Sequence, residues 1–369
     1  MTPVVDAADL RRYAIARSLF APAGLQAAIE RLGFVQADPI RAPARAQDLA
    51  LRHRVAGYRA GDLDRSYPAL DVEEDFVINY GFVPRAVYAL MHPRTVRPAW
   101  SASRRKRAQA VLEFVRERGD VHPRDVDAHF AHGAVVNAWG GSSSATTHLL
   151  DAMHYRGMLR VARRERGIRI YAARVEEPST RLDANARAER LDALVDVAVR
   201  KYAPLPAAGL NVLVRRLRYA APQWRGGLER ALMRARQRLA HASVDGTSWY
   251  WPVGEDARIG ADAIDGEARL LAPFDPIVWD RARFERFFGW AYRFEAYTPA
   301  TRRKLGYYAL PLLWRGHAIG WGNVALRGGA IAVDFGYVAG KPPRERAFKV
   351  ALDAEIERMR AFLADDDDA

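Results

Sequence analysis

The sequence predicts an α+β fold in which three tandem winged helix-turn-helix units precede a C-terminal antiparallel β domain that ends in a helix. Helical patterns followed by a two-stranded pattern recur three times, and a segment dense in aromatic residues with strand-like patterns follows. The predicted units span residues 1–100, 101–178, 179–267 and 268–369. The first three share no detectable sequence repeat, so their repetition is inferred only from the order of elements.

The first unit begins with two helical patterns. Residues 6–20 place apolar side chains at helical spacing after Asp6, a suitable N-cap, and a second helix covers 22–32. A run of β-branched and aromatic residues over 76–83 then predicts a strand. Helices followed by strands are compatible with a winged helix-turn-helix, without being diagnostic of one.

The second unit carries the clearest winged pattern. An amphipathic helix is predicted over 145–156, and residues 158–174 alternate apolar and basic side chains around an Arg-Gly tip, as expected of a two-stranded wing. Seven arginines and one acid, Glu165, fall between residues 156 and 174. A basic hairpin beside a recognition helix is suited to a phosphate backbone, although winged helices also serve as protein-interaction modules. The predicted DNA contacts here are the helix N-cap Ser144 and the wing residues Arg160, Arg163 and Arg164.

The remaining elements follow in the same way. In the third unit, a helix over 228–240 leads to the hairpin signal Asp245-Gly246. Antiparallel strands are predicted over 307–313, 318–325 and 330–335, and a final helix over 343–363.

Composition limits the class of protein. The 369 residues are 50% hydrophobic and 27% charged, as in a folded chain, and contain no cysteine, which excludes disulfides and thiolate catalysis. Only five of the 57 basic residues are Lys, a usage typical of a GC-rich genome, but the net charge of +13 indicates a polyanionic partner, most plainly nucleic acid. With no secretory signal or membrane-spanning run in the sequence, we expect a cytoplasmic, nucleoid-associated monomer.

A short stretch, LGFVQADPIRAPARAQDLAL over 32–51, is the candidate site. If it is extended, Gln36 and Asp38 point to the same side, and Arg41 and Arg45 follow them. An amide beside a carboxylate in a cationic surround could polarise a water next to an anionic polymer. The alternative is that Asp38 and Pro39 start a turn and Gln36 is a solvated surface residue. On the pattern alone, the turn is the favoured interpretation.

The C-terminal segment carries a resemblance. Its motifs are Pro-Phe-Asp-Pro at 273–276, Trp-Asp-Arg at 279–281, Tyr-Arg-Phe-Glu-Ala-Tyr-Thr-Pro at 292–299 and Gly-Tyr-Tyr-Ala-Leu-Pro-Leu-Leu at 306–313. In this order they resemble the signature of the YcaQ/AlkZ-like winged-helix DNA glycosylases, which remove bulky alkylated bases and unhook interstrand crosslinks. Gln36-Ala37-Asp38 matches the Gln-x-Asp or Gln-x-Gln of that family. Phe82-Val83-Pro84-Arg85 also matches, whereas residues 76–80 lack the His that often precedes it there.

The resemblance implies a fold and an activity. The fold would be three tandem winged helices in a C-shaped arrangement with a β-barrel-like C-terminal domain. The activity would be monofunctional hydrolysis of the N-glycosidic bond of N7-alkylated purines, with crosslink unhooking as a further implied activity. Asp38 would stabilise the sugar cation or act as general base, Gln36 would hold the water or the sugar, and Arg41, Arg45 and Arg85 would contact DNA.

Two functions therefore remain. The first is a DNA glycosylase that acts on double-stranded DNA with alkylated purines and uses no metal and no nucleotide cofactor. The alternative is a non-catalytic winged-helix DNA-binding protein, such as a transcriptional regulator, in which Gln36 and Asp38 are dispensable.

Overall fold

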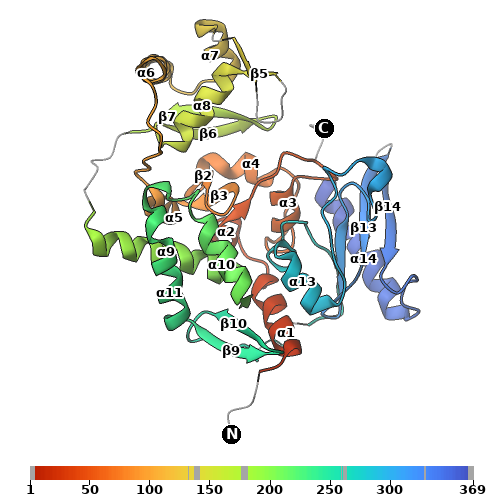
Figure 1. Ribbon diagram of the computed structural model, residues 1–369. Coiled ribbons are helices and arrows are strands. Elements are labelled where there is room, and N and C mark those ends of the chain that lie inside the picture. Colours follow the sequence, from red (N-terminus) through yellow and green to blue (C-terminus); the bar gives the residue numbers. More distant parts are fainter. Residues whose placement is uncertain are drawn as a thin grey trace.

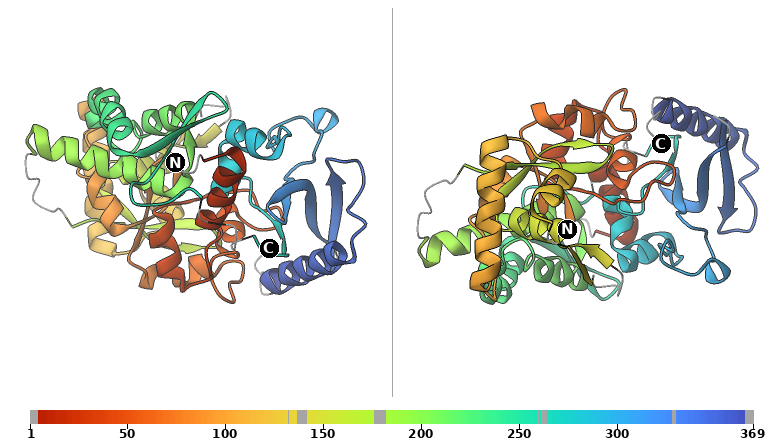
Figure 2. Two further views of the ribbon diagram at one scale, coloured as in Figure 1. Left: turned by 90° about the horizontal axis from the view of Figure 1, so that it is seen from below. Right: turned by 90° about the horizontal axis from the view of Figure 1, so that it is seen from above.

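The chain is a mixed α/β protein whose described strands form five small antiparallel sheets. The computed structural model describes residues 5–131, 133–136, 142–175, 182–258, 260, 264–327 and 330–364. The N-terminal segment lies in the middle of the molecule, with α6–α8 above it, α9–α11 to one side and the C-terminal sheet on the other (Figure 1). Views from below and above show the C-terminal sheet and α14 together at one end (Figure 2).

The N-terminal segment is built of short helices and a three-stranded sheet of order β1-β3-β2. Its elements are α1 (Ala7–Ser18), α2 (Leu25–Leu32), β1 (Val35–Gln36), α3 (Ala46–Leu51), α4 (Asp62–Ser66), η1 (Tyr67–Ala69), β2 (Val72–Phe76), β3 (Tyr80–Pro84) and α5 (Arg85–Met91). Asp6 caps α1 as predicted, in a reciprocal capping box with Asp9. Gly33 ends α2 in the left-handed conformation, which glycine adopts without steric cost.

The single strand predicted over 76–83 was wrong. The structure places a turn inside that run, between β2 and β3, and β2 begins earlier, at Val72. The sequence hid β2 because three of its five residues are acids, which ordinarily avoid strand interiors. All three acids, Glu73, Glu74 and Asp75, are buried, and each is paired with arginine.

In the second segment, the predicted helix over 145–156 and the predicted two-stranded wing over 158–174 are both present. It contains α6 (Ala102–Arg118), α7 (Pro123–Phe130), β4 (Ala134–Val136), β5 (Ser142–Ser144), α8 (Ala145–Tyr155), β6 (Leu159–Glu165) and β7 (Ile168–Ala173). The prediction that Ser144 caps α8 is confirmed, since its hydroxyl accepts from the N–H groups of Thr146 and Thr147. The β6–β7 hairpin turns at Arg166 and Gly167, both with positive φ.

The third segment pairs helices with a second three-stranded sheet, of order β8-β10-β9. Its elements are α9 (Ala184–Tyr202), β8 (Leu205–Pro206), α10 (Ala207–Arg216), η2 (Pro222–Gly227), α11 (Leu228–Arg238), β9 (Ala240–Val244) and β10 (Thr247–Trp251). The predicted Asp245-Gly246 turn joins β9 to β10.

The C-terminal segment contains one four-stranded sheet. Its elements are β11 (Ala268–Leu270), α12 (Pro276–Trp279), α13 (Arg281–Phe288), η4 (Ala300–Arg302), β12 (Leu310–Trp314), β13 (His317–Arg327), β14 (Ala330–Tyr337) and α14 (Arg346–Leu363). The barrel-like domain implied by the resemblance differs from this arrangement. The described strands follow the order β11-β12-β13-β14, so β11 and β14 are opposite edges of an open sheet.

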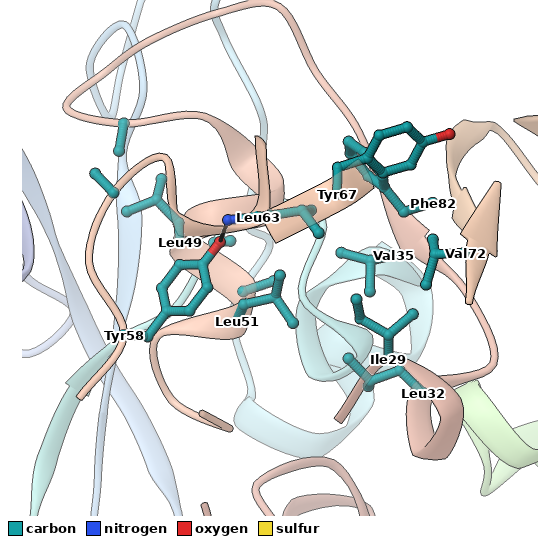
Figure 3. Close-up of a cluster of buried hydrophobic side chains, with 14 of the residues drawn as sticks. Ile29, Leu32, Val35, Leu49, Leu51, Tyr58, Leu63, Tyr67, Val72 and Phe82 are labelled. Atoms are coloured by element: carbon teal, nitrogen blue, oxygen red, sulfur yellow. Dashed lines mark hydrogen bonds between the residues drawn. The ribbon is translucent and has the colours of Figure 1, made fainter. Parts of the chain in front are cut away.

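The apolar core is continuous across the segments. One cluster of buried side chains joins residues of the first, second and C-terminal segments, and another joins the first and third. Val35 of β1 gathers with Ile29, Leu51 and the rings of Tyr67 and Phe82 (Figure 3). The centroids of these two rings lie 5.7 Å apart. The short strand that carries Gln36 therefore rests on a packed core. None of the described helices combines the length and the apolar character needed to cross a bilayer.

Candidate active site

A pocket of about 510 Å³ brings the N-terminal motif and the C-terminal signature together. It is lined by Gln36 and Asn79 from the first segment, by Ala208, Gly209, Val212 and Arg216 from α10, and by Phe274, Trp279, Asp280, Arg281 and Ala282 from the C-terminal segment. Aromatic rings, an amide pair, a carboxylate and two guanidinium groups thus surround one space. Such a mixture of apolar surface and a few convergent polar groups is typical of a ligand site.

Gln36 is held at the edge of this pocket by a relay of hydrogen bonds. Its side-chain Oε1 accepts from Asn79 Nδ2 at 2.8 Å, and Asn79 Oδ1 accepts from Arg216 Nη1 at 3.0 Å. The Arg216 guanidinium also lies 5.5 Å from the ring centroid of Trp279. Because Asn79 occupies the oxygen of Gln36, the NH₂ group is the end that Gln36 can offer to a substrate or a water.

The position of β1 depends on close backbone packing. Gln36 pairs with Gly81 of β3, and a Cβ at residue 81 would come within 2.6 Å of the Phe34 ring and still closer to the Val35 carbonyl. Only glycine fits this crossing. On the opposite side, the buried Lys201 of α9 donates a hydrogen bond to the Phe34 carbonyl and lies over the Phe34 ring.

Asp38 lies just beyond β1 and is half-buried. Its Oδ1 accepts from the N–H of Ile40 at 2.9 Å, so the predicted Asp-Pro turn does form. Asp38 is not among the residues that line the pocket with Gln36. Burial nevertheless raises the pKa of Asp38, and the Ile40 hydrogen bond only partly opposes this. The carboxylate is therefore less well solvated than an ordinary surface turn residue.

The charge of Asp38 acts on two tyrosines of the C-terminal segment, Tyr297 and Tyr308. The hydroxyl of Tyr308 is buried, and no hydrogen-bond partner is found for it within the described ranges. Burial, and next the charge of Asp38, raises the pKa of Tyr308 well above its ordinary value. The same two causes raise the pKa of Tyr297, which is exposed. Asp38 is thus close enough to influence two residues of the family signature electrostatically, although it does not line the pocket.

Most of the predicted DNA contacts on the wing are turned inward. Arg164 donates to both carboxylate oxygens of Glu74, at 2.8 and 2.6 Å, and Arg160 lies 3.8 Å from Glu73. Arg163 pairs with Asp120 at 2.5 Å and with Glu165 at 2.7 Å. Arg160 and Arg164 therefore dock the second segment on β2, whereas the ion pairs of Arg163 lie within its own segment. Contact of these arginines with DNA stays a prediction.

The other predicted contacts are scattered. Arg45 is buried, pairs with Asp64 at 2.6 Å and packs against Gly167 of the wing, so it does not present a guanidinium to solvent. The Ser144 hydroxyl caps α8 and also donates to Asp127. Arg85 is half-exposed and pairs with Asp71 and Glu73, and Arg41 is exposed near Asp38 in the chain.

Sequence reasoning missed Asn79 and Arg216. Asn79 lies in the β2–β3 turn, within the stretch in which the family often has a His, and that departure was the available signal. Arg216 is one of several arginines at the end of α10, and nothing in its local pattern distinguishes it. Only the folded structure brings it to Asn79.

Comparison of the whole fold identifies a solved structure with a similar fold. The chain is similar over 98% of its length to the solved structure of Streptomyces sahachiroi DNA glycosylase AlkZ, of which 97% is covered, with a TM-score of 0.61 and 13% sequence identity. At that identity, the match shows a shared fold with a DNA glycosylase.

The sequence match is more specific. The family described as DNA glycosylase AlkZ-like matches residues 29–362, a range that includes both Gln36 and the C-terminal signature. The chain belongs to the AlkZ-like DNA glycosylase family, and the resemblance inferred from its motifs is confirmed.

Proposed function

We propose that this DNA glycosylase is monofunctional and hydrolyses the N-glycosidic bond of N7-alkylated purines in duplex DNA, including purines joined in interstrand crosslinks. One observation carries the proposal. Gln36, fixed by Asn79, lines a pocket with Phe274, Trp279 and Arg281, while Asp38 lies two residues away as a half-buried carboxylate.

The chemistry follows from the charge of the substrate. An N7-alkylguanine is already cationic, so the base leaves as a neutral molecule when the N-glycosidic bond breaks and takes the bonding electrons. The sugar develops oxocarbenium character, and the Asp38 carboxylate opposes that charge. A water then forms the new bond to the anomeric carbon and passes its proton to Asp38, which acts as general base. The products are the free base and an abasic site.

In this scheme Gln36 positions the water or the sugar and does not transfer a proton. Its NH₂ group, left available by the Asn79 hydrogen bond, donates to the attacking water or to a sugar oxygen. A lysine nucleophile is not needed. Lys201 is buried and donates to the Phe34 carbonyl, which agrees with hydrolysis rather than strand cleavage.

We also propose how the chain is divided into domains and in what state it acts. We take the first three segments, residues 1–100, 101–178 and 179–267, as winged helices, because each combines helices with a small antiparallel hairpin or sheet. Residues 268–369 form the C-terminal domain. A monomer on duplex DNA in the nucleoid is the expected state. Of the predicted DNA contacts we retain Arg41 and Arg85, which are both exposed.

The test uses duplex DNA that carries a single N7-methylguanine. Wild-type protein should generate alkali-labile abasic sites, and Asp38→Asn should slow this by about 10²–10³-fold, as loss of a transition-state stabiliser does. DNA affinity should persist in Asp38→Asn. Asp353→Asn, at an exposed carboxylate of α14, is the matched control and should retain full activity.

The outcomes separate the two functions. Absence of product above the spontaneous rate on several N7 adducts would refute the proposed substrate class. Sequence-selective binding that is unchanged by Gln36→Ala and Asp38→Asn, together with such inactivity, would instead support the regulator.

A further inference from the structure

The loop between α13 and β12 carries a concentration of exposed aromatic and basic side chains. Residues 296–309 include Arg302, Arg303 and Lys304 and contain no acid. Tyr297 is 77% exposed and Tyr307 is 44% exposed. Single exposed apolar side chains are ordinary, but two exposed rings on one loop beside three cations form a patch of the kind that marks an interaction site.

This loop is held in shape by its own polar contacts. The buried Glu295 carboxylate accepts from the backbone N–H groups of Lys304 and Leu305, at 2.8 and 2.7 Å. Arg303 donates to the Thr298 carbonyl at 2.8 Å and lies 4.9 Å from the ring centroid of Tyr307. Glu295, the acid next to the loop in sequence, therefore fixes the loop backbone rather than pairing with the loop cations.

The cations of the loop differ from those of the wing in their ion pairing. Within the described ranges, no carboxylate forms an ion pair with Arg302, Arg303 or Lys304. By contrast, Arg160, Arg163 and Arg164 of the wing are each paired with acids. Cations that the protein itself does not neutralise are the ones available to phosphates.

The loop also lies beside the candidate active site. The centroid of the Phe294 ring lies 6.0 Å from that of Tyr297 and 5.1 Å from that of Phe274. Phe274 in turn lines the Gln36 pocket. Next to burial, the charge of Asp38 contributes to the raised pKa of Tyr297.

We propose that the 296–309 loop is a DNA-contacting surface of this protein, in which Arg302 and Lys304 bind phosphates and the Tyr297 ring stacks on bases next to the residue being cleaved. Stacking of an exposed ring on bases tolerates any sequence, and an inserted side chain can unstack a base step to open the duplex at the lesion. This inference rests on the proposed action on duplex DNA.

The first experiment measures affinity for a labelled duplex as a function of salt, by fluorescence anisotropy, in an Asp38→Asn background so that the DNA stays intact. Changing Arg302→Ala and Lys304→Ala together should make the slope of log K against log salt shallower by about 1.8, since each phosphate contact contributes about 0.9. The control, Lys341→Ala with Arg344→Ala, removes two exposed cations from the turn before α14 and should leave the slope unchanged.

The second experiment concerns the ring. Tyr297→Ala should weaken binding roughly tenfold or more, the cost of losing one stacked base, whereas Tyr297→Phe should bind like the parent. Equal slopes for the loop variant and its control, or unchanged affinity of Tyr297→Ala, would overturn the proposal. Excision of N7-methylguanine is measured separately, in protein that keeps Asp38. A failure of the proposed enzymatic activity would therefore appear in the excision assay, and a failure of the loop proposal in the binding assays.

Discussion

The side-chain oxygen of Gln36 is occupied by Asn79, whose Nδ2 donates to it at 2.8 Å, and Asn79 is held in turn by Arg216. A residue of the predicted catalytic motif is thus oriented from a β-turn of its own segment and from a helix of another. This relay leads to the first prediction.

Loss of either relay residue should slow base excision through Gln36. A neutral hydrogen bond contributes about 0.5–1.5 kcal/mol, so Asn79→Ala should lower the single-turnover rate about 2–12-fold. Arg216→Ala should have at least this effect, and the double variant should cost less than the sum, because the two act in series. Asn211→Ala, at another α10 amide that binds an arginine, is the control. Fully additive effects would contradict the relay.

The β1–β3 crossing should tolerate no side chain at residue 81. Gly81→Ala drives a methyl group into the Val35 carbonyl and the Phe34 ring, so we expect a loss of about 1–3 kcal/mol or more in the free energy of unfolding. Excision should fall with it, because Gln36 shifts. Gly226→Ala, where a Cβ meets nothing within 4 Å, should be close to neutral in the same urea titration. Similar stability of the two variants would argue against the crossing as described.

The buried Arg164–Glu74 pair should matter for stability rather than for DNA affinity. Arg164→Met leaves a buried carboxylate uncompensated and should cost about 3–5 kcal/mol in urea unfolding. Adding Glu74→Gln should recover part of that loss. Arg163→Ala, which breaks a partly exposed ion pair, should lower the free energy of unfolding by at most about 1 kcal/mol. If Arg164→Met instead left stability intact and flattened the salt dependence of DNA binding, the wing would be a DNA contact after all.

Lys201 should make folding stability depend on pH. Burial, followed by the nearby charge of Arg54, lowers the pKa of Lys201 to about 7, from 10.5 for an ordinary lysine. Between these pH values the unfolded chain binds a proton that the folded chain does not, so the free energy of unfolding contributed by Lys201 rises from pH 7 to about 10.5. Urea titrations at pH 7 and pH 9.5 should show a smaller rise for Lys201→Met than for wild type. An identical rise would show that Lys201 titrates normally.

The ionised carboxylate of Asp38 should be needed for excision but should lower the stability of the folded protein. Because its pKa is raised in the folded state, the ionised carboxylate costs stability at neutral pH, and this cost disappears as the pH falls through the raised pKa. Asp38→Asn keeps an oxygen for the Ile40 N–H and should therefore raise the melting temperature at pH 7 while slowing excision about 10²–10³-fold. The gain should shrink toward acidic pH, where wild-type excision also declines. A lower melting temperature for Asp38→Asn at pH 7 would contradict this.

Local patterns in the sequence predicted the helices and the wing well. The Asp6 and Ser144 caps and the Asp245-Gly246 turn all depend on neighbouring residues alone, and the structure confirms each. Strand β2 was missed because its stability comes from arginines far along the chain, which neutralise Glu73, Glu74 and Asp75 once the segments meet.

The candidate site could be predicted only in part. The motif placed Gln36 and Asp38 together, but their partners come from the β2–β3 turn, α10 and the C-terminal segment. The ion pairs of the wing arginines could not be predicted for a related reason, and their contact with DNA stays a prediction. A count of charges says which residues can bind an anion, and only the fold says that the anion they bind is a carboxylate of the same molecule.

The docking of the wing on β2 has a consequence for recombination between relatives. If the 101–178 segment were grafted onto the first segment of a relative, the arginines of its hairpin would meet a surface without Glu73 and Glu74. In the protein that lost this segment, Glu73 and Glu74 of β2 would remain buried without the arginines that neutralise them. Such a chimera should fold only when β2 is transferred as well, so the smallest exchangeable unit of this chain is larger than any one of its segments.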